Sequence, residues 1–122
     1  MIYALHAGLG VILEEGIENA CARHQACGDL LQEGLEKMGL ELFAKEGHRL
    51  PQLTSVYIPQ ERLPEGKDEA AVRRLLLDNY GIEIGGGLGP VSGRVWRIGC
   101  MGHTARMRNV TLLLGALAEV LN

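Results

Sequence analysis

Apolar residues recur at intervals of three and four positions in four segments of the chain, and this spacing predicts four helices. The expected helices cover residues 2–13, 17–38, 69–79 and 105–121. The stretch 14–16 reads Glu-Glu-Gly and predicts a break between the first two helices, because two charges and a glycine interrupt the apolar pattern there.

Residues at the ends of the predicted helices support these limits. Asp68 is suited to be an N-cap and Thr104 is expected to cap the last helix, while Gly39 and Gly81 are suited to follow helix ends. The stripe that should be buried in the second helix is Ile17, Cys21, His24, Cys27, Leu31, Leu35 and Met38. The corresponding stripe of the last helix is Met107, Val110, Leu114, Leu117 and Leu121.

Alternation of apolar and other residues predicts four strands. They are expected at residues 40–44, 54–58, 82–84 and 94–101, with the first at an edge of the sheet. The element order is then α-α-β-β-α-β-β-α. This order favours a two-layer α/β (α+β) fold, in which a small, mostly antiparallel sheet has helices packed on one face.

The predicted strand 94–101 carries an arginine inside an apolar run. Because strand side chains alternate, Arg97 lies on the face opposite Trp96, between a valine and a glycine. These small neighbours leave room for a flat anion, and the guanidinium fork matches a carboxylate. The pattern alone leaves ligand binding and an edge residue in water equally open.

A glycine-rich stretch, residues 85–89, precedes Pro90 and leads into this strand. In nucleotide-binding loops such glycines lead to the N-terminus of a helix. Here another strand follows, so a tight structural connection is favoured over a phosphate-binding loop.

Composition and charge are those of an ordinary globular domain. The 122 residues are 47% hydrophobic and 22% charged, with a net charge of −3, so neither nucleic acid nor an anionic membrane is an expected partner. No apolar run approaches the roughly 20 residues that span a bilayer, and no signal peptide is expected. Three cysteines, Cys21, Cys27 and Cys100, form no paired framework and favour a reducing, intracellular compartment.

Residues suited to catalysis do not form a complete site. Lys37, Lys45 and Lys67 all lie in polar surroundings, and none is expected to have the lowered pKa of a Schiff-base lysine. Cys21 and His24 have a spacing that could bind a metal, but no second ligand pair follows, so we expect no metal site. For His24 a buried or hydrogen-bonded structural role is favoured over catalysis.

The segments GIEIGGGLGP and RVWRIGCMG resemble the C-terminal small domain of serine–pyruvate and alanine–glyoxylate aminotransferases, which are class V, fold-type-I enzymes that use pyridoxal phosphate (PLP). The similarity extends to YALHAGLGVILEEGIENACARHQ and KMGLELFAKEGHRLPQLTSVYIP. It implies that Arg97 binds the substrate α-carboxylate, and that Gly86, Gly87 and Leu88 border the active site. The catalytic Schiff-base lysine of the family belongs to a large domain that this chain does not contain.

The resemblance therefore implies one small domain over residues 1–122, with residues 1–15 as the tail of the interdomain helix. The whole protein would be a PLP-dependent homodimer acting on amino acids and 2-oxo acids, in the cytoplasm or, in a eukaryote, a peroxisome or mitochondrion. The chain alone should be inactive, hold no PLP and self-associate through its first helix. The alternatives are a free-standing module that binds an amino or keto acid, and a protein-interaction domain.

Overall fold

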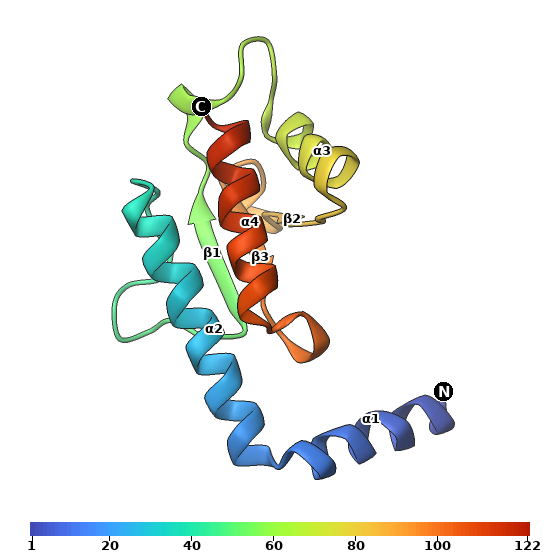
Figure 1. Cartoon of the computed structure of the whole chain (residues 1–122). Coiled ribbons are helices and arrows are strands. Elements are labelled where there is room, and N and C mark those ends of the chain that lie inside the picture. Colours follow the sequence, from blue (N-terminus) through green and yellow to red (C-terminus); the bar gives the residue numbers. More distant parts are fainter.

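A computed structural model describes residues 1–122 and contains four α-helices and a three-stranded sheet (Figure 1). Short 3₁₀ turns cover residues 60–62, 89–91 and 102–104. The main elements in chain order are α1 (Ile2–Glu15), α2 (Ile17–Lys37), β1 (Leu53–Tyr57), α3 (Glu69–Tyr80), β2 (Gly85–Gly86), β3 (Val95–Gly99) and α4 (Met107–Val120).

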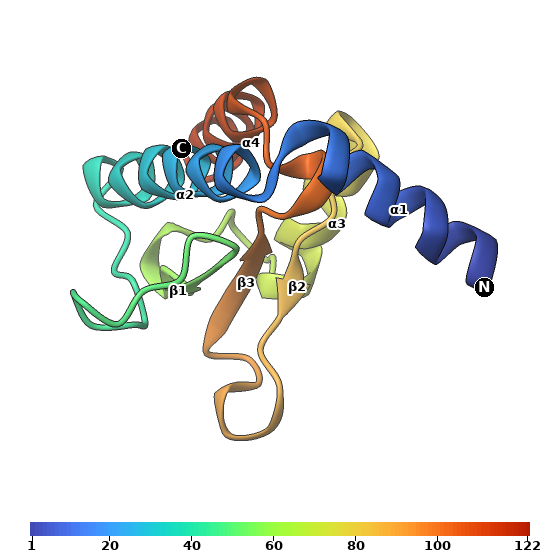
Figure 2. The same ribbon diagram turned by 90° about the horizontal axis from the view of Figure 1, so that it is seen from below.

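The sheet is antiparallel, with the strand order β1–β3–β2, so β3 is the central strand. Figure 2 shows α2 and α4 together on one side of β1 and β3. The predicted fold, a small antiparallel sheet with helices on one face, is confirmed. None of the helices combines the length and the apolarity that a membrane crossing requires.

Two of the predicted strands, residues 40–44 and 82–84, are wrong. Residues 40–44 contribute a single bridge, Leu42 to Val56, because the polar turn that follows leads the chain away from the sheet edge. Residues 82–84 are not a strand either. Gly81 turns the chain after α3 with a φ of 64°, and Ile84 packs into the core, so pairing with β3 begins at Gly85.

The core lies between the helices and the face of the sheet that carries Trp96 and Ile98, which are 0% and 3% exposed. Trp96, Ile98 and Cys100 are all buried, as the alternation predicts, and Val56 of β1 joins them. The helices contribute Cys27, Leu31 and Leu35 from α2, Val72 and Leu76 from α3, and Val110, Leu113, Ala116 and Leu117 from α4.

The buried stripe of α2 is shorter than predicted. Ile17 and Cys21 are exposed and His24 is half-buried, whereas Ala20 is buried. These residues are exposed because the first turns of α2 extend past the sheet toward α1 (Figure 1). Gly16, with a φ of 82°, separates the two helices and confirms the predicted break.

The last helix differs from the prediction at its start. Thr104 does not cap α4; its hydroxyl bonds to the backbone of Met101 and closes the 3₁₀ turn 102–104, so α4 begins at Met107. This start leaves Met107 exposed and Leu114 half-buried, while Leu113 and Ala116 are buried instead. For α3, the Asp68 carboxylate accepts a 2.8 Å bond from the Ala71 amide and caps the helix as predicted.

Helix α1 has no buried residue and projects from the rest of the domain (Figure 1). Its predicted stripe is exposed: Ile2, Leu5, Leu9 and Ile12 are 82%, 63%, 51% and 42% exposed. A row of exposed apolar side chains of this size normally belongs to an interface. Self-association through α1 stays a prediction.

An ion pair on α3 holds the largest core side chain. The Glu69 carboxylate accepts bonds from Arg73 Nε at 2.9 Å and from the buried Trp96 Nε1 at 3.1 Å. The hydrogen bond from Arg73 is the main reason that the pKa of Glu69 lies below its usual 4.5, and the bond from Trp96 contributes to the shift. One carboxylate therefore joins α3 to β3 and satisfies the indole N–H.

Replacing Glu69 should destabilise the domain. Glu69→Ala leaves a buried indole N–H without a partner, which costs about 1–3 kcal/mol, whereas Glu69→Gln keeps an acceptor and should cost less. Urea unfolding followed by Trp96 fluorescence measures both variants. Because folding lowers the pKa of Glu69, its charge stabilises the fold above about pH 4.5, and this contribution is lost as the pH falls through the lowered value. Glu69→Gln should weaken that pH dependence, and an unchanged acid profile would contradict the assignment.

Candidate functional site

Arg97 lies at the centre of the sheet, on the face that the helices leave open. Its register partners are Ser55 on β1 and Gly85 on β2, so the side chains at these positions share its face. Val95, its neighbour on that face, is buried, while Gly99 is exposed. The positions of Gly85 and Gly99 therefore place no side chain beside the half-exposed arginine.

The Arg97 guanidinium has free donors. Its Nε donates to the Gly86 carbonyl at 2.8 Å, and this is its one hydrogen bond to the protein. No carboxylate lies within ion-pair distance, although four other arginine or lysine side chains form such pairs. The two terminal nitrogens are thus available to a ligand, and a carboxylate is the anion that their parallel geometry suits.

The glycines of β2 make this arrangement possible. A Cβ at Gly85 would lie 3.3 Å from Arg97 Nη2, so a side chain there would press on the guanidinium. Gly86 supplies the carbonyl that orients it, while a Cβ at Gly86 would face Arg73 at 3.5 Å on the helix-covered side. The glycine-rich sequence therefore lets the arginine lie against β2.

The connection after β2 is a tight turn, as the sequence predicts. A Cβ at Gly87 would lie within 1.9 Å of the Val91 carbonyl oxygen, so the chain can fold back here only with glycine. The turn leads into β3, not into the N-terminus of a long helix, and Leu88 is 65% exposed at its tip. That Gly86, Gly87 and Leu88 border an active site stays a prediction.

The structure does not bring the other candidate residues to Arg97. Lys37, Lys45 and Lys67 are exposed, and Lys37 pairs with Glu33 at 3.5 Å. His24 is occupied by backbone groups, since Nδ1 lies 2.6 Å from the Ala20 carbonyl and Nε2 accepts from the Gly102 amide at 2.9 Å. These bonds confirm the structural interpretation of His24.

Arg97 itself lines neither of the two largest hollows. One, of about 300 Å³, lies beside α4 and the segment 80–84. The larger, of about 970 Å³, lies between α1, α2 and the turn 102–104, and is bordered by Glu15, Arg23 and His24. The sequence gives no direct signal for this cluster, because Glu15 and Arg23 belong to different helices and meet only where Gly16 bends the chain.

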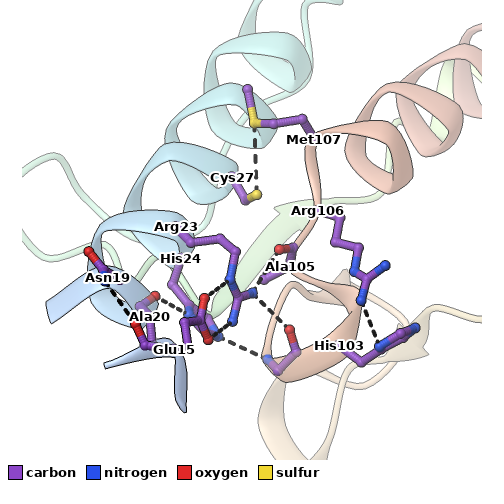
Figure 3. A network of polar contacts seen from close by, with 11 residues as sticks. Glu15, Asn19, Ala20, Arg23, His24, Cys27, His103, Ala105, Arg106 and Met107 are labelled. Atoms are coloured by element: carbon purple, nitrogen blue, oxygen red, sulfur yellow. Dashed lines mark hydrogen bonds and ion pairs between the residues drawn. The ribbon is translucent and has the colours of Figure 1, made fainter. Parts of the chain in front are cut away.

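Arg23 is the centre of the polar network in this second hollow (Figure 3). It forms a two-pronged ion pair with Glu15, with Nε–Oε1 at 2.5 Å and Nη2–Oε2 at 2.8 Å. The hydrogen bond between the side chains lowers the pKa of Glu15 and raises that of Arg23. Nη1 also donates to the carbonyls of Gly102 and Ala105.

Comparisons with known proteins identify the class of domain. The chain is 41% identical over 121 residues to (S)-ureidoglycine–glyoxylate transaminase of Bacillus subtilis. The matched residues cover 99% of this chain and 28% of that protein. It is 40% identical to alanine–glyoxylate aminotransferase of Callithrix jacchus, over 98% of this chain and 28% of the relative. No known protein-family profile matches.

A solved structure shows the same fold. The crystal structure of alanine–glyoxylate aminotransferase from Nostoc superposes on 98% of this chain and 30% of its own, with a TM-score of 0.87 and 45% identity. The chain is thus homologous to the C-terminal small domain of aminotransferases. Within that class it resembles the alanine–glyoxylate and ureidoglycine–glyoxylate enzymes, and it spans about 28% of the length of these curated relatives.

Gly87→Ala should disrupt the turn that leads into β3. The new methyl group would meet a backbone oxygen that cannot move aside, and forcing an extra methyl group into such a site costs about 1–3 kcal/mol or more. Gly115→Ala is the matched control, because a Cβ there meets nothing within 4 Å and alanine favours a helix by about 0.5–1 kcal/mol. Urea unfolding compares the two, and equal stability of both variants would contradict the steric argument.

Proposed function

We propose that this chain is the substrate-carboxylate-binding domain of a PLP-dependent aminotransferase of the alanine–glyoxylate type. The observation that carries the proposal is Arg97, whose two terminal nitrogens are unpaired on the open face of the sheet. The homology supports the reaction class, since transfer of an amino group between an amino acid and a 2-oxo acid requires recognition of a carboxylate in both substrates.

The geometry of Arg97 indicates how the carboxylate would bind. Because Nε is bonded to the Gly86 carbonyl, the fork that remains is formed by Nη1 and Nη2. Two parallel charge-assisted bonds fix the direction of the carboxylate as well as its position. Arg97 therefore orients the bonds at the substrate Cα. It contributes to the reaction by positioning the substrate and does not transfer a proton.

The residues of this chain do not fit a PLP site by themselves. Each of the three lysines is exposed to water, and none lies in a shielded pocket of the kind in which a Schiff base forms. We propose that the lysine and most of the cofactor pocket belong to a large domain of the whole protein. Residues 1–15 would then be the tail of the helix that joins the two domains, with the apolar side chains of α1 covered by the large domain, and the whole protein would be a homodimer.

The alternatives differ in what they expect of α1. A free-standing amino- or keto-acid-binding module would gain nothing from a helix whose apolar side chains are exposed and of which no residue is buried. A protein-interaction domain would use such a helix, but would have no need of an unpaired arginine on the sheet. An aminotransferase domain accounts for both features.

Arg97→Lys in the whole protein should lower kcat/KM by roughly ten- to a hundredfold, because one charge-assisted hydrogen bond of about 1.5–3 kcal/mol is lost. Arg97→Ala should cost more, since the carboxylate is left without a counter-charge. Steady-state kinetics with an amino acid donor and a 2-oxo acid acceptor measure the loss. PLP content should stay that of the unmodified protein.

An amine substrate that lacks a carboxylate is the control for Arg97. Its slow reaction should be nearly indifferent to both substitutions. Equal losses on the two kinds of substrate, or release of the cofactor from Arg97→Ala, would mean that Arg97 is structural.

The 122-residue chain alone should neither transaminate nor bind PLP as an internal aldimine, because all its lysines are exposed. Absorption spectra after mixing with PLP, followed by borohydride reduction and peptide mapping, measure the outcome. Scattered, substoichiometric modification of surface lysines is the expected result. A stoichiometric adduct on one lysine, together with turnover, would contradict the prediction.

A further inference from the structure

We propose that Arg23 is a positioning residue that fixes the angle at which α1 leaves the domain. It thereby holds β3, the strand that carries Arg97, in a fixed position relative to the rest of the whole protein. This inference rests on the proposed function for its effect on activity. The latch itself, the contacts of Arg23 with Glu15 and with the turn 102–105, is present in this chain.

The junction between α1 and α2 contains a glycine, Gly16. Gly16 has a φ of 82° and joins the two helices, and a glycine backbone alone would allow a range of angles between them. The Asn19 amide also donates to the Glu15 carbonyl at 2.8 Å, so Asn19 and Arg23 both act at this junction. Glu15 is the last residue of α1, immediately before this glycine. Its carboxylate accepts hydrogen bonds from both Nε and Nη2 of Arg23, and this bidentate pair restricts the direction of α1 relative to α2.

Arg23 also joins α2 to the segment after β3. The remaining terminal nitrogen of Arg23 donates to the Gly102 carbonyl at 2.9 Å and to the Ala105 carbonyl at 2.8 Å. His24 accepts from the Gly102 amide at 2.9 Å. Two successive side chains of α2 thus hold both polar groups of the Gly102 residue, which lies three positions after the end of β3.

These contacts require the side chain of an arginine. Four hydrogen bonds use four of its five N–H groups and reach two separate segments, the end of α1 and the turn 102–105, which no lysine could reproduce. The two side chains of the ion pair are 32% and 27% exposed, so they are partly shielded from water. Figure 3 shows the guanidinium between Glu15 and the turn that carries Ala105.

The consequence concerns Arg97. If α1 continues into the large domain, as proposed above, the latch sets the distance between that domain and β3. Loss of the latch should therefore weaken recognition of the substrate carboxylate while leaving the free donors of Arg97 intact.

Two spin labels in the whole protein test the latch directly. They are placed at His6→Cys on α1 and Asp78→Cys on α3, both exposed, in a background in which Cys21 and any reactive cysteine outside this chain are serine. Cys27 and Cys100 are 1% and 3% exposed and escape the reagent. Pulsed electron–electron double resonance should give a narrow distribution of distances between the two labels for the unmodified protein, and a broader or shifted one for Arg23→Met.

Arg49→Met is the matched control, because Arg49 also joins a carboxylate, that of Glu36 at 2.8 Å, to a backbone carbonyl, but lies away from α1. It should leave the distance distribution unchanged. Glu15→Gln removes the charge of the pair while keeping the contacts of Arg23 with the carbonyls, so it tests the latch even if Arg23→Met fails to fold. An unchanged distribution in Glu15→Gln and in any folded Arg23→Met protein would overturn the proposal.

Kinetics of the same variants test the link to Arg97. Arg23→Met should raise KM for an amino acid on the order of tenfold, since a misplacement of 1 Å can cost roughly 10²-fold, and should spare an amine without a carboxylate. A broadened distribution with unchanged KM would overturn the link. If Arg97→Ala shows that the proposed function is wrong, the distance measurement still decides whether the latch exists, because it requires no substrate.

Discussion

The packing of β3 between its two neighbours and under the helices is the constraint on which the rest of the structure depends. Trp96 on one face is fully buried and is held by the Glu69 carboxylate, and this contact fixes the strand against α3. Because side chains alternate along a strand, burying Trp96 places Arg97 on the opposite, open face. The core and the candidate carboxylate site are therefore two sides of one strand.

The glycines of the hairpin serve this arrangement in different ways. Gly85 leaves space for the guanidinium, and Gly86 supplies the carbonyl that directs it. Gly87 allows the chain to fold back where any side chain would strike the Val91 oxygen. A stretch that resembles a phosphate-binding loop in composition is thus a strand end and a turn shaped around an arginine.

The domain also has a second polar centre, at the junction of α1 and α2. There Arg23 joins the end of α1 to the turn that follows β3, while the apolar side chains of α1 remain exposed. A helix that is fixed in direction but not covered is suited to carry another part of a protein. In the proposed aminotransferase, the two arginines have complementary tasks, since Arg97 binds the substrate and Arg23 holds the frame in which it does so.

Most of the secondary structure could be predicted from the sequence, and the reasons are local. Helix periodicity, the Asp68 cap, the Gly16 break and the alternation around Trp96 depend on neighbours within a few positions, so they can be interpreted without tertiary contacts. The same local pattern placed Arg97 opposite the core face, and the family resemblance implied its ligand.

Tertiary structure decided the remainder, because it depends on where segments meet. Whether residues 82–84 or 85–86 pair with β3 follows from the burial of Ile84, and the start of α4 follows from the turn that Thr104 closes. The Arg23 network could not be predicted, since its members come from two helices and a turn that lies 79 to 82 residues further along the chain. Periodicity shows which face of an element is buried, but only packing shows which distant groups lie beside it.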